Sequence, residues 1–273
     1  MPHSDTRQPL DVDALRAAML RPGHGWSRLD VVSSTGSTNA DLLSRAQAGV
    51  DVAGSVLLAE FQSAGRGRHG RNWATPPRAQ IAMSVGIDVT GIAAEKWGWL
   101  PLLTGVALVD SVSQVGGVSV GLKWPNDVLA GADKLAGVLA EVASPSPTIV
   151  IGLGLNVSLT PDELPTPTAT SLQMLGATTL DRNILVSAIL HRLGVLIERW
   201  RSTAGDDDRL RSDYLRCSLT IGTTVRALLP GDREIVGVAK GIDESGRLLI
   251  DDGTDVHVVA AGDITHLRPA SGA

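Results

Sequence analysis

The sequence predicts an α+β fold made of a larger domain, with interleaved helices and strands, and a small C-terminal β domain. Two observations predict this division. Before residue 218 apolar strand patterns alternate with helical ones, and Asn183 to Arg201 is the clearest amphipathic helix because its apolar residues recur at helical spacing. After Leu219 four or five short β runs are separated by turns rich in glycine, proline and aspartate. We therefore expect a domain boundary near residue 218.

Helix and strand signals follow one another along the first part of the chain. Asp11 to Leu20 has the apolar spacing of a short helix, and the side chains of Ser37 to Asn39 can cap a second helix that runs to about Gly49. Ser55–Glu60 and Gln80–Ile87 are typical of strands. Residues 62–78 between them form a Gly/Arg/Pro-rich loop, and loops of such length tend to be functional or disordered.

The later elements are shorter, apart from a buried helix predicted at Trp97–Val115 with Pro101 in its first turn. Strands are expected at Val120–Trp124, Val128–Ala130, Leu135–Val142 and Thr148–Leu153, a helix at Asp206–Arg216, and further strands at Thr220–Leu229, Glu234–Ile242, Arg247–Asp251 and Val256–Ala261. The expected parts are residues 1–24 for a tail and short helix, 25–218 for the larger domain, 219–268 for the β domain and 269–273 for a tail.

Length and composition place the chain among globular proteins. Its 273 residues are 43% hydrophobic and 19% charged, which excludes a disordered or fibrous chain, and a chain of this length needs no disulfide or metal to be stable. The net charge of −5 excludes the overall basic field of non-specific nucleic-acid binders. A single cysteine, Cys217, forms neither an intramolecular disulfide nor a zinc site. Because the sequence carries no signal peptide and no uninterrupted apolar span, we expect a cytoplasmic protein.

The segment Gly65 to Trp73 is the strongest local signal for function. Its three arginines repel one another and its three glycines lose conformational entropy on ordering, so the segment does not stabilise a core. Glycine lets backbone N–H groups approach a phosphate, and guanidinium binds phosphate or carboxylate through two hydrogen bonds. We therefore favour anion binding, with a solvated loop and a grip on a nucleic-acid backbone as the alternatives.

Other motifs are weaker when each is taken alone. Lys123 and Lys134, two of only four lysines, flank a Pro-Asn-Asp turn, and a lysine leaving an apolar strand needs an anion or an ion-pair partner. Ser37-Thr38-Asn39 is explained by a helix cap, and Gly152 to Asn156 is similar to a phosphate loop but lacks the full dinucleotide spacing. Histidines occur in none of the usual metal-binding patterns, and we assign His69 to the basic loop.

Taken together, and in this order, these motifs resemble the biotin protein ligases. The resemblance rests on STGSTNADLL (34–43), AEFQSAGRGRHGRNW (59–73), GLKWPNDVLA (121–130), KLAGVLAEV (134–142) and IVIGLGLNV (149–157). It implies a mixed-sheet catalytic domain of the biotin/lipoate protein ligase type with flanking helices, followed by a small Src-homology-3-like β-barrel. It also implies a reaction in two steps: biotin and ATP give biotinyl-5′-AMP and pyrophosphate, and biotin then passes to a lysine of a carrier protein.

The resemblance assigns roles to individual residues. It implies a biotin pocket formed by Ser37, Thr38, Asn39, Gln62, Arg66, Gly67, Arg68, Lys134 and Gly137, and nucleotide contacts from Arg71, Trp73, Asn126 and Asn156. Lys134 would lie between the biotin carboxylate and the α-phosphate, and Arg68 would act with it. Asp127 would orient the incoming lysine amine or remove its proton.

The resemblance further implies the partners. Mg²⁺ would arrive with ATP rather than occupy a fixed protein site, and the acceptor would be the biotin carboxyl carrier domain of acyl-CoA carboxylases. We expect a monomer or weak homodimer and no membrane partner. We also expect no DNA partner, because the first motif begins at Ser34 and leaves too little preceding chain for a repressor domain. Without ligand the loop arginines would lack counter-charges, so we expect residues 63–75 to be disordered until the adenylate binds.

Two rival functions stay open at this point. A lipoate or octanoate ligase has the same general fold, but its acyl-cysteine relatives need a thiol in the catalytic domain, whereas Cys217 lies at the far edge. A nucleic-acid-binding module built on the Gly/Arg loop is disfavoured by the net charge and by the scarcity of aromatic residues beside Trp73.

Overall fold

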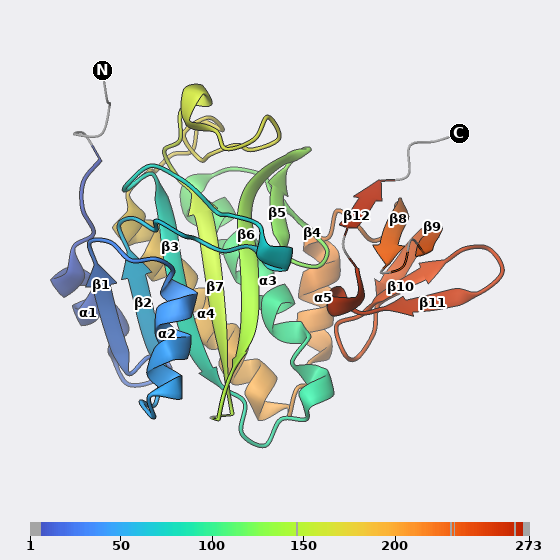
Figure 1. Ribbon diagram of the computed structural model, residues 1–273, viewed down its shortest axis with the longest axis horizontal. Helices are drawn as coiled ribbons and strands as arrows, with labels where there is room; N and C mark the ends of the chain where they lie inside the picture. Colours follow the sequence, from blue (N-terminus) through green and yellow to red (C-terminus); the bar gives the residue numbers. More distant parts are fainter. Residues whose placement is uncertain (1–6, 146, 230, 232, 265, 270–273) are drawn as a thin grey trace.

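The larger domain is built on one seven-stranded mixed sheet (Figure 1). The computed structural model describes residues 7–145, 147–229, 231, 233–264 and 266–269. In spatial order the strands are β1 (Arg28–Val32), β2 (Ser55–Ala59), β3 (Gln80–Asp88), β7 (Thr148–Asn156), β6 (Asp133–Ala143), β5 (Asp127–Ala130) and β4 (Gly121–Lys123). The pair β1–β2 is parallel and the other ladders are antiparallel.

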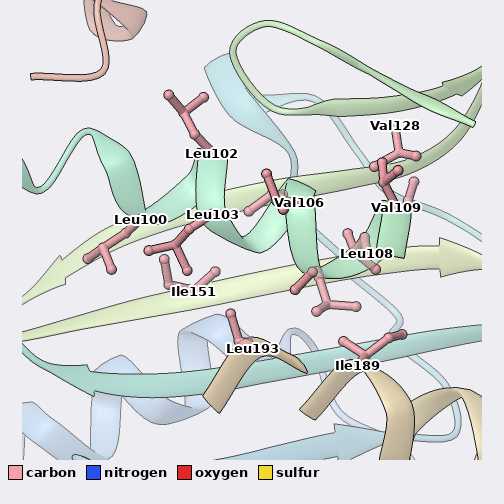
Figure 2. Packing of buried hydrophobic residues seen from close by; sticks show 14 of the residues in the cluster. Leu100, Leu102, Leu103, Val106, Leu108, Val109, Val128, Ile151, Ile189 and Leu193 are labelled. Atoms are coloured by element: carbon pink, nitrogen blue, oxygen red, sulfur yellow. The ribbon is translucent and has the colours of Figure 1, made fainter. Parts of the chain in front are cut away.

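Helices cover both faces of this sheet. They are α1 (Val12–Met19), α2 (Thr38–Gln47), α3 (Trp99–Gly116), α4 (Arg182–Ser202) and α5 (Asp208–Cys217). α2 lies in front of the sheet in Figure 1, and α3 and α4 lie behind it. Figure 2 shows α3 leucines packed near Ile151 of β7 and near Ile189 and Leu193 of α4. Helices were expected near these positions, and Pro101 does sit in the first turn of α3.

Strand alternation separates a large core from the face that carries α2. On β7, Ile149, Ile151, Leu153 and Leu155 belong to the core beneath α3 and α4, whereas Val150 belongs to the small cluster under α2. Successive side chains of a strand point to opposite faces. The alternate residues of β7 therefore face the α2 side; these are Gly152, Gly154 and Asn156. The strand also extends three residues beyond its predicted end at Leu153.

The C-terminal part is a five-stranded antiparallel sheet, as expected from the short β runs. Its strands are β8 (Thr224–Leu229), β9 (Arg233–Ile242), β10 (Leu248–Asp251), β11 (Val256–Val259) and β12 (His266–Pro269), in the spatial order β11-β10-β9-β8-β12. β12 is the fifth strand, to which no residues had been assigned. No helix among the described residues is both long and apolar enough to cross a bilayer.

The C-terminal sheet packs against the larger domain through two buried tryptophans. Trp99 Nε1 donates to the Glu244 carbonyl at 3.0 Å, and Trp124 Nε1 donates to the Gly246 carbonyl at 3.2 Å. Trp124 is 1% exposed, so this member of the KWPND motif is structural. A Cβ at Gly98 would lie 2.3 Å from the Ser245 carbonyl oxygen, so the contact requires glycine. The two parts therefore pack as one body around the KWPND turn.

Candidate active site

One cavity of about 390 Å³ lies on the α2 face of the sheet. Its walls come from the start of α2, the loop 62–78, and strands β3 to β7. All fourteen residues assigned from the sequence line it: Ser37, Thr38, Asn39, Gln62, Arg66, Gly67, Arg68, Arg71, Trp73, Asn126, Asp127, Lys134, Gly137 and Asn156. Residues that are up to 119 positions apart in the chain (37 to 156) therefore meet at one place.

The N-terminus of α2 forms the polar end of the cavity. Ser37 caps the helix, accepting a hydrogen bond from the Ala40 N–H, which is the structural role that its sequence also allowed. The Thr38 N–H donates to Gln62 Oε1 at 2.8 Å, and Thr38 Oγ1 lies 2.6 Å from Ser84 Oγ. Gln62 is thereby fixed against the first turn of the helix.

Asn39 is oriented by partners on both sides of its amide. Ser84 Oγ donates to Asn39 Oδ1 at 2.6 Å, and Asn39 Nδ2 donates to Glu141 Oε2 at 2.8 Å. A Cβ at Gly152 would lie 2.3 Å from Asn39 Oδ1, so glycine leaves the space that the amide occupies. With Asn39 only 3% exposed, an unpaired amide group here would cost about 1–3 kcal/mol.

Trp73 lies against the same strands, next to Gly154 and Gly137. A Cβ at Gly154 would be 2.5 Å from the Trp73 indole nitrogen, and Gly137, which pairs with Gly154 across the ladder, is also close to the ring. The indole N–H donates to Gln80 Oε1. The Gly152–Asn156 segment therefore belongs to strand β7, and its likeness to a phosphate loop was misleading. Its glycines leave space for Asn39 and Trp73.

Lys134 and Asp127 form an ion pair in the cavity wall. Lys134 Nζ lies 2.6 Å from Asp127 Oδ1, with the two side chains 34% and 23% exposed. Lys134 Nζ also lies 5.4 Å from the centroid of the Trp73 ring. The Lys134 N–H donates to the Thr168 carbonyl at 2.7 Å, and the Lys134 carbonyl accepts from the Thr170 N–H at 3.0 Å. These backbone bonds fix the backbone of Lys134 in the cavity wall.

The arginine loop folds back on itself over the cavity. The Gly67 N–H donates to the Arg71 carbonyl at 2.7 Å, and the Trp73 N–H donates to the Gly65 carbonyl at 2.8 Å. A Cβ at Gly65 would lie 2.3 Å from the Trp73 carbonyl oxygen, so the close approach of the two arms requires glycine. A short 3-10 turn, η1 (Arg68–Gly70), forms the tip.

Two arginines of the loop already have partners without ligand. Arg66 Nη2 lies 3.2 Å from Glu141 Oε2. Arg68 Nη1 donates to Asn126 Oδ1 at 3.2 Å, and its Nη2 donates to the Ala261 carbonyl of the C-terminal part. Burial lowers the pKa of Arg68 below its ordinary value, and Asp127 opposes that shift. The expectation that the loop arginines lack counter-charges is therefore wrong for Arg66, because Glu141 folds in beside it.

Two asparagines present defined groups in the cavity wall. The Asn126 side chain is held by a hydrogen bond from its Nδ2 to the Val138 carbonyl at 3.0 Å. Asn156 Nδ2 donates to the Thr170 carbonyl at 2.9 Å, whereas its Oδ1 is buried without a hydrogen bond among the described residues. Since Asn156 lines the cavity and is 2% exposed, this oxygen is an acceptor suited to a ligand N–H or O–H group.

The cavity's donor set fits Mg²⁺ only as an ion that accompanies a phosphate. The described residues contain no group of three His, Cys, Asp or Glu side chains arranged to hold a metal, and Asp127 is the single carboxylate among the residues found to line the cavity. Mg²⁺ commonly binds through one or two carboxylates together with substrate phosphates and water. Cys217 is buried at the end of α5 and is not one of the cavity-lining residues.

Among the residues of the site to which sequence reasoning assigned no role are four polar ones. Gln80, Ser84 and Glu141 hold Trp73, Asn39 and Arg66, and Lys123 lines the cavity although no role was assigned to it. A signal for two of them was present: Gln80 and Ser84 are polar residues alternating with apolar ones along β3, which places them on the face opposite the large core. Glu141 belongs to the segment KLAGVLAEV (134–142), but no feature of that segment singled it out.

Comparisons with known proteins agree with this geometry. A model of the Biotin/lipoate A/B protein ligase family matches residues 31–156, and one of the Biotin protein ligase C terminal domain matches residues 220–267. The Biotin--[acetyl-CoA-carboxylase] ligase of Mycobacterium tuberculosis is 51% identical over 265 residues, covering 96% of this chain and 97% of that protein. The Bifunctional ligase/repressor BirA of Escherichia coli is 32% identical over 86% of this chain and 72% of its own length.

A solved structure extends the likeness to the whole fold. The biotin protein ligase from Aquifex aeolicus in complex with biotin and ATP matches with a TM-score of 0.75 at 25% sequence identity, covering 90% of this chain and 100% of that one. Both family models match, the fold is similar to that of the solved ligase, and the chain is 51% identical to the mycobacterial relative. The chain therefore belongs to the biotin protein ligase family.

Proposed function

We propose that this protein is an ATP-dependent biotin protein ligase acting on the biotin carboxyl carrier domain of acyl-CoA carboxylases. The observation that carries the proposal is the single cavity in which a buried polar end, a central lysine and an arginine loop meet. A ligase of this kind must hold a carboxylate and a triphosphate in contact, and one cavity lined by the residues for both meets that need.

The first step joins the biotin carboxylate to the α-phosphate of ATP. A carboxylate oxygen forms a bond to phosphorus, the bond to the β-phosphate breaks, and pyrophosphate leaves. Negative charge accumulates at the reacting centre, and we assign Lys134 and Arg68 to its stabilisation. Mg²⁺ bound to ATP would neutralise the phosphates further, with Asp127 as the carboxylate available in the cavity.

The two ends of the cavity suit the two substrates. At the α2 end, the oriented Asn39 amide, Thr38 and Gln62 provide the donors and acceptors that a ureido ring requires. At the other end, Trp73 provides a flat ring for the adenine, and Asn156 Oδ1 provides an acceptor. Arg71 is assigned to the nucleotide, together with Asn126.

The second step transfers biotin to the carrier lysine. The amine nitrogen bonds to the acyl carbon of the mixed anhydride, AMP leaves, and the nitrogen loses a proton. We assign Asp127 to orienting that amine or accepting its proton. In the ligand-free protein its carboxylate pairs with Lys134. The assignment therefore requires Lys134 to move from Asp127 to the phosphate when ATP binds, before the adenylate forms.

The proposal is tested with the full chain, ATP, Mg²⁺ and a purified carrier domain. We expect pyrophosphate release with biotin, and mass spectrometry should show a single biotin added to the carrier lysine. Lipoate and octanoate serve as alternative acids, and omission of Mg²⁺ should stop the release. Faster turnover with lipoate or octanoate than with biotin would contradict the proposal.

A further inference from the structure

Glu141 lies outside the set of residues that line the cavity, yet it contacts two that do. It is on the α2 face of β6, two residues beyond Leu139, and pairs in register with Val150 of β7. Its Oε2 accepts a hydrogen bond from Asn39 Nδ2 at 2.8 Å and lies 3.2 Å from Arg66 Nη2. One carboxylate oxygen of Glu141 thus joins Asn39, at the start of α2, to Arg66 of the loop 62–78.

The contact of Glu141 with Asn39 fixes which way round the Asn39 amide lies. Ser84 donates to Oδ1, so Nδ2 must find an acceptor, and Glu141 supplies it at the shorter distance; the Leu139 carbonyl is 3.4 Å away. Without the Glu141 acceptor, the Asn39 amide can rotate or leave a buried N–H poorly paired. Glu141 therefore orients a group that the proposed function assigns to biotin.

The contact to Arg66 holds the loop in the absence of ligand. The Arg66 side chain is 43% exposed and that of Glu141 is 27% exposed, so this ion pair is accessible to water and weak. A weak pair is easily exchanged for a stronger one, and the carboxylate of biotin or the phosphate of the adenylate offers Arg66 an anion of the same kind.

We propose that Glu141 is a positioning residue with two separable tasks: its oxygen orients the Asn39 amide for biotin, and its charge holds Arg66 until the substrate anion replaces it. The proposal rests on the proposed function for the identity of the ligand. It requires a carboxylate for the second task, but only a hydrogen-bond acceptor for the first. The substitutions Glu141→Gln and Glu141→Ala separate these needs.

The experiment uses the full chain and two readouts. Amide exchange across residues 63–75 without ligand reports the hold on the loop, and calorimetric titration with biotin alone reports the orientation of Asn39. Glu141→Gln should speed loop exchange about threefold, as expected for loss of an exposed pair, and leave biotin affinity within about twofold of the original. Glu141→Ala should speed exchange equally and weaken biotin binding about tenfold, because a buried N–H loses its acceptor.

A matched control is Glu234→Gln, which removes a similar exposed pair, Arg226–Glu234, in the C-terminal sheet. It should leave both readouts unchanged. Unaltered amide exchange of the loop in both Glu141 variants would contradict the proposal that Glu141 holds Arg66 in the ligand-free protein. Wild-type biotin affinity in Glu141→Ala, or equal losses of affinity in both variants, would overturn the assignment to Asn39. Failure of the unsubstituted chain to bind biotin would instead count against the proposed function, and the exchange measurement would still decide the hold on Arg66.

Discussion

The floor of the cavity and the loop above it are built in opposite ways. The floor consists of strand β7 and the side chains of Asn39 and Trp73 that lie against it. There, Gly152 and Gly154 leave space for these two side chains, and hydrogen bonds fix both of them. Above it, residues 65–72 are joined by a few backbone bonds, and the contact of Arg66 with Glu141 is open to water. Burial raises the cost of breaking a polar contact, so the floor is set before ligand binds, whereas the loop can respond to ligand.

This difference suggests that the floor and the loop have different roles in the reaction. The floor and the wall hold the groups that must be correctly placed when the substrates meet, since misplacement reduces the rate directly. The loop holds arginines to which the substrates bring further anions, and its order can therefore follow occupancy and keep water from the reactive anhydride. Each of the following predictions perturbs one side of this comparison.

The largest effect is expected in the cavity wall, from Lys134→Ala. Removal of one charge-stabilising donor commonly costs about 10²–10³ in rate, so biotin-dependent pyrophosphate release should fall by that factor. Circular dichroism and thermal unfolding should stay close to those of the original protein, because Lys134 is not part of the core. Lys240→Ala, which removes a surface lysine paired with Asp251, is the control. A near-normal rate in Lys134→Ala would remove the lysine from its assigned role.

The next effect concerns Asp127 in the same wall. Asp127→Asn should slow transfer from preformed biotinyl-adenylate to the carrier lysine by about 10², the lower range for loss of a general base. Single-turnover transfer measured by mass spectrometry separates this step from adenylate formation. If adenylate formation slows as much as transfer, the role of Asp127 lies in positioning Lys134 rather than the amine.

Two neighbouring glycines of the floor should affect different substrates. A methyl group at position 152 collides with Asn39, and one at position 154 collides with Trp73. Gly152→Ala should weaken biotin binding, and Gly154→Ala should weaken ATP binding, each by about 10- to 100-fold as expected for overpacking. Calorimetric titrations with each substrate measure this. Gly241→Ala on β9, where a Cβ meets nothing within 4 Å, is the control, and a loss of the same substrate in both variants would contradict the prediction.

The smallest effect is expected in the loop itself. Saturation with biotinyl-adenylate should slow amide exchange across residues 63–75 several-fold, because the adenylate phosphate adds a partner for the arginines. Exchange in β8–β10 of the C-terminal sheet should change little. Equal loop exchange with and without biotinyl-adenylate would show that the loop is as fixed as the floor.

Local sequence patterns were sufficient to predict most elements of this fold. The amphipathic spacing of α4, the capping side chain before α2 and the apolar run of α3 depend on residues within a few turns of one another. Elements with mixed signals were less well defined, such as β7, which continues through a glycine-rich segment to Asn156. There the packing partners, rather than intrinsic preference, decide the strand.

The sequence by itself determined the family resemblance, the two-part α+β organisation and fourteen of the residues that line the cavity, because motifs such as GRGRHGRNW and KWPND are continuous in the chain. Only the tertiary structure decided what these residues touch. Asn39 meets Glu141 across 102 positions of sequence, and Gly154 receives Trp73, because strand order and register bring them together. Composition and local spacing do not fix register, so the partner of Arg66 and the purpose of the β7 glycines emerge only when the sheet is assembled.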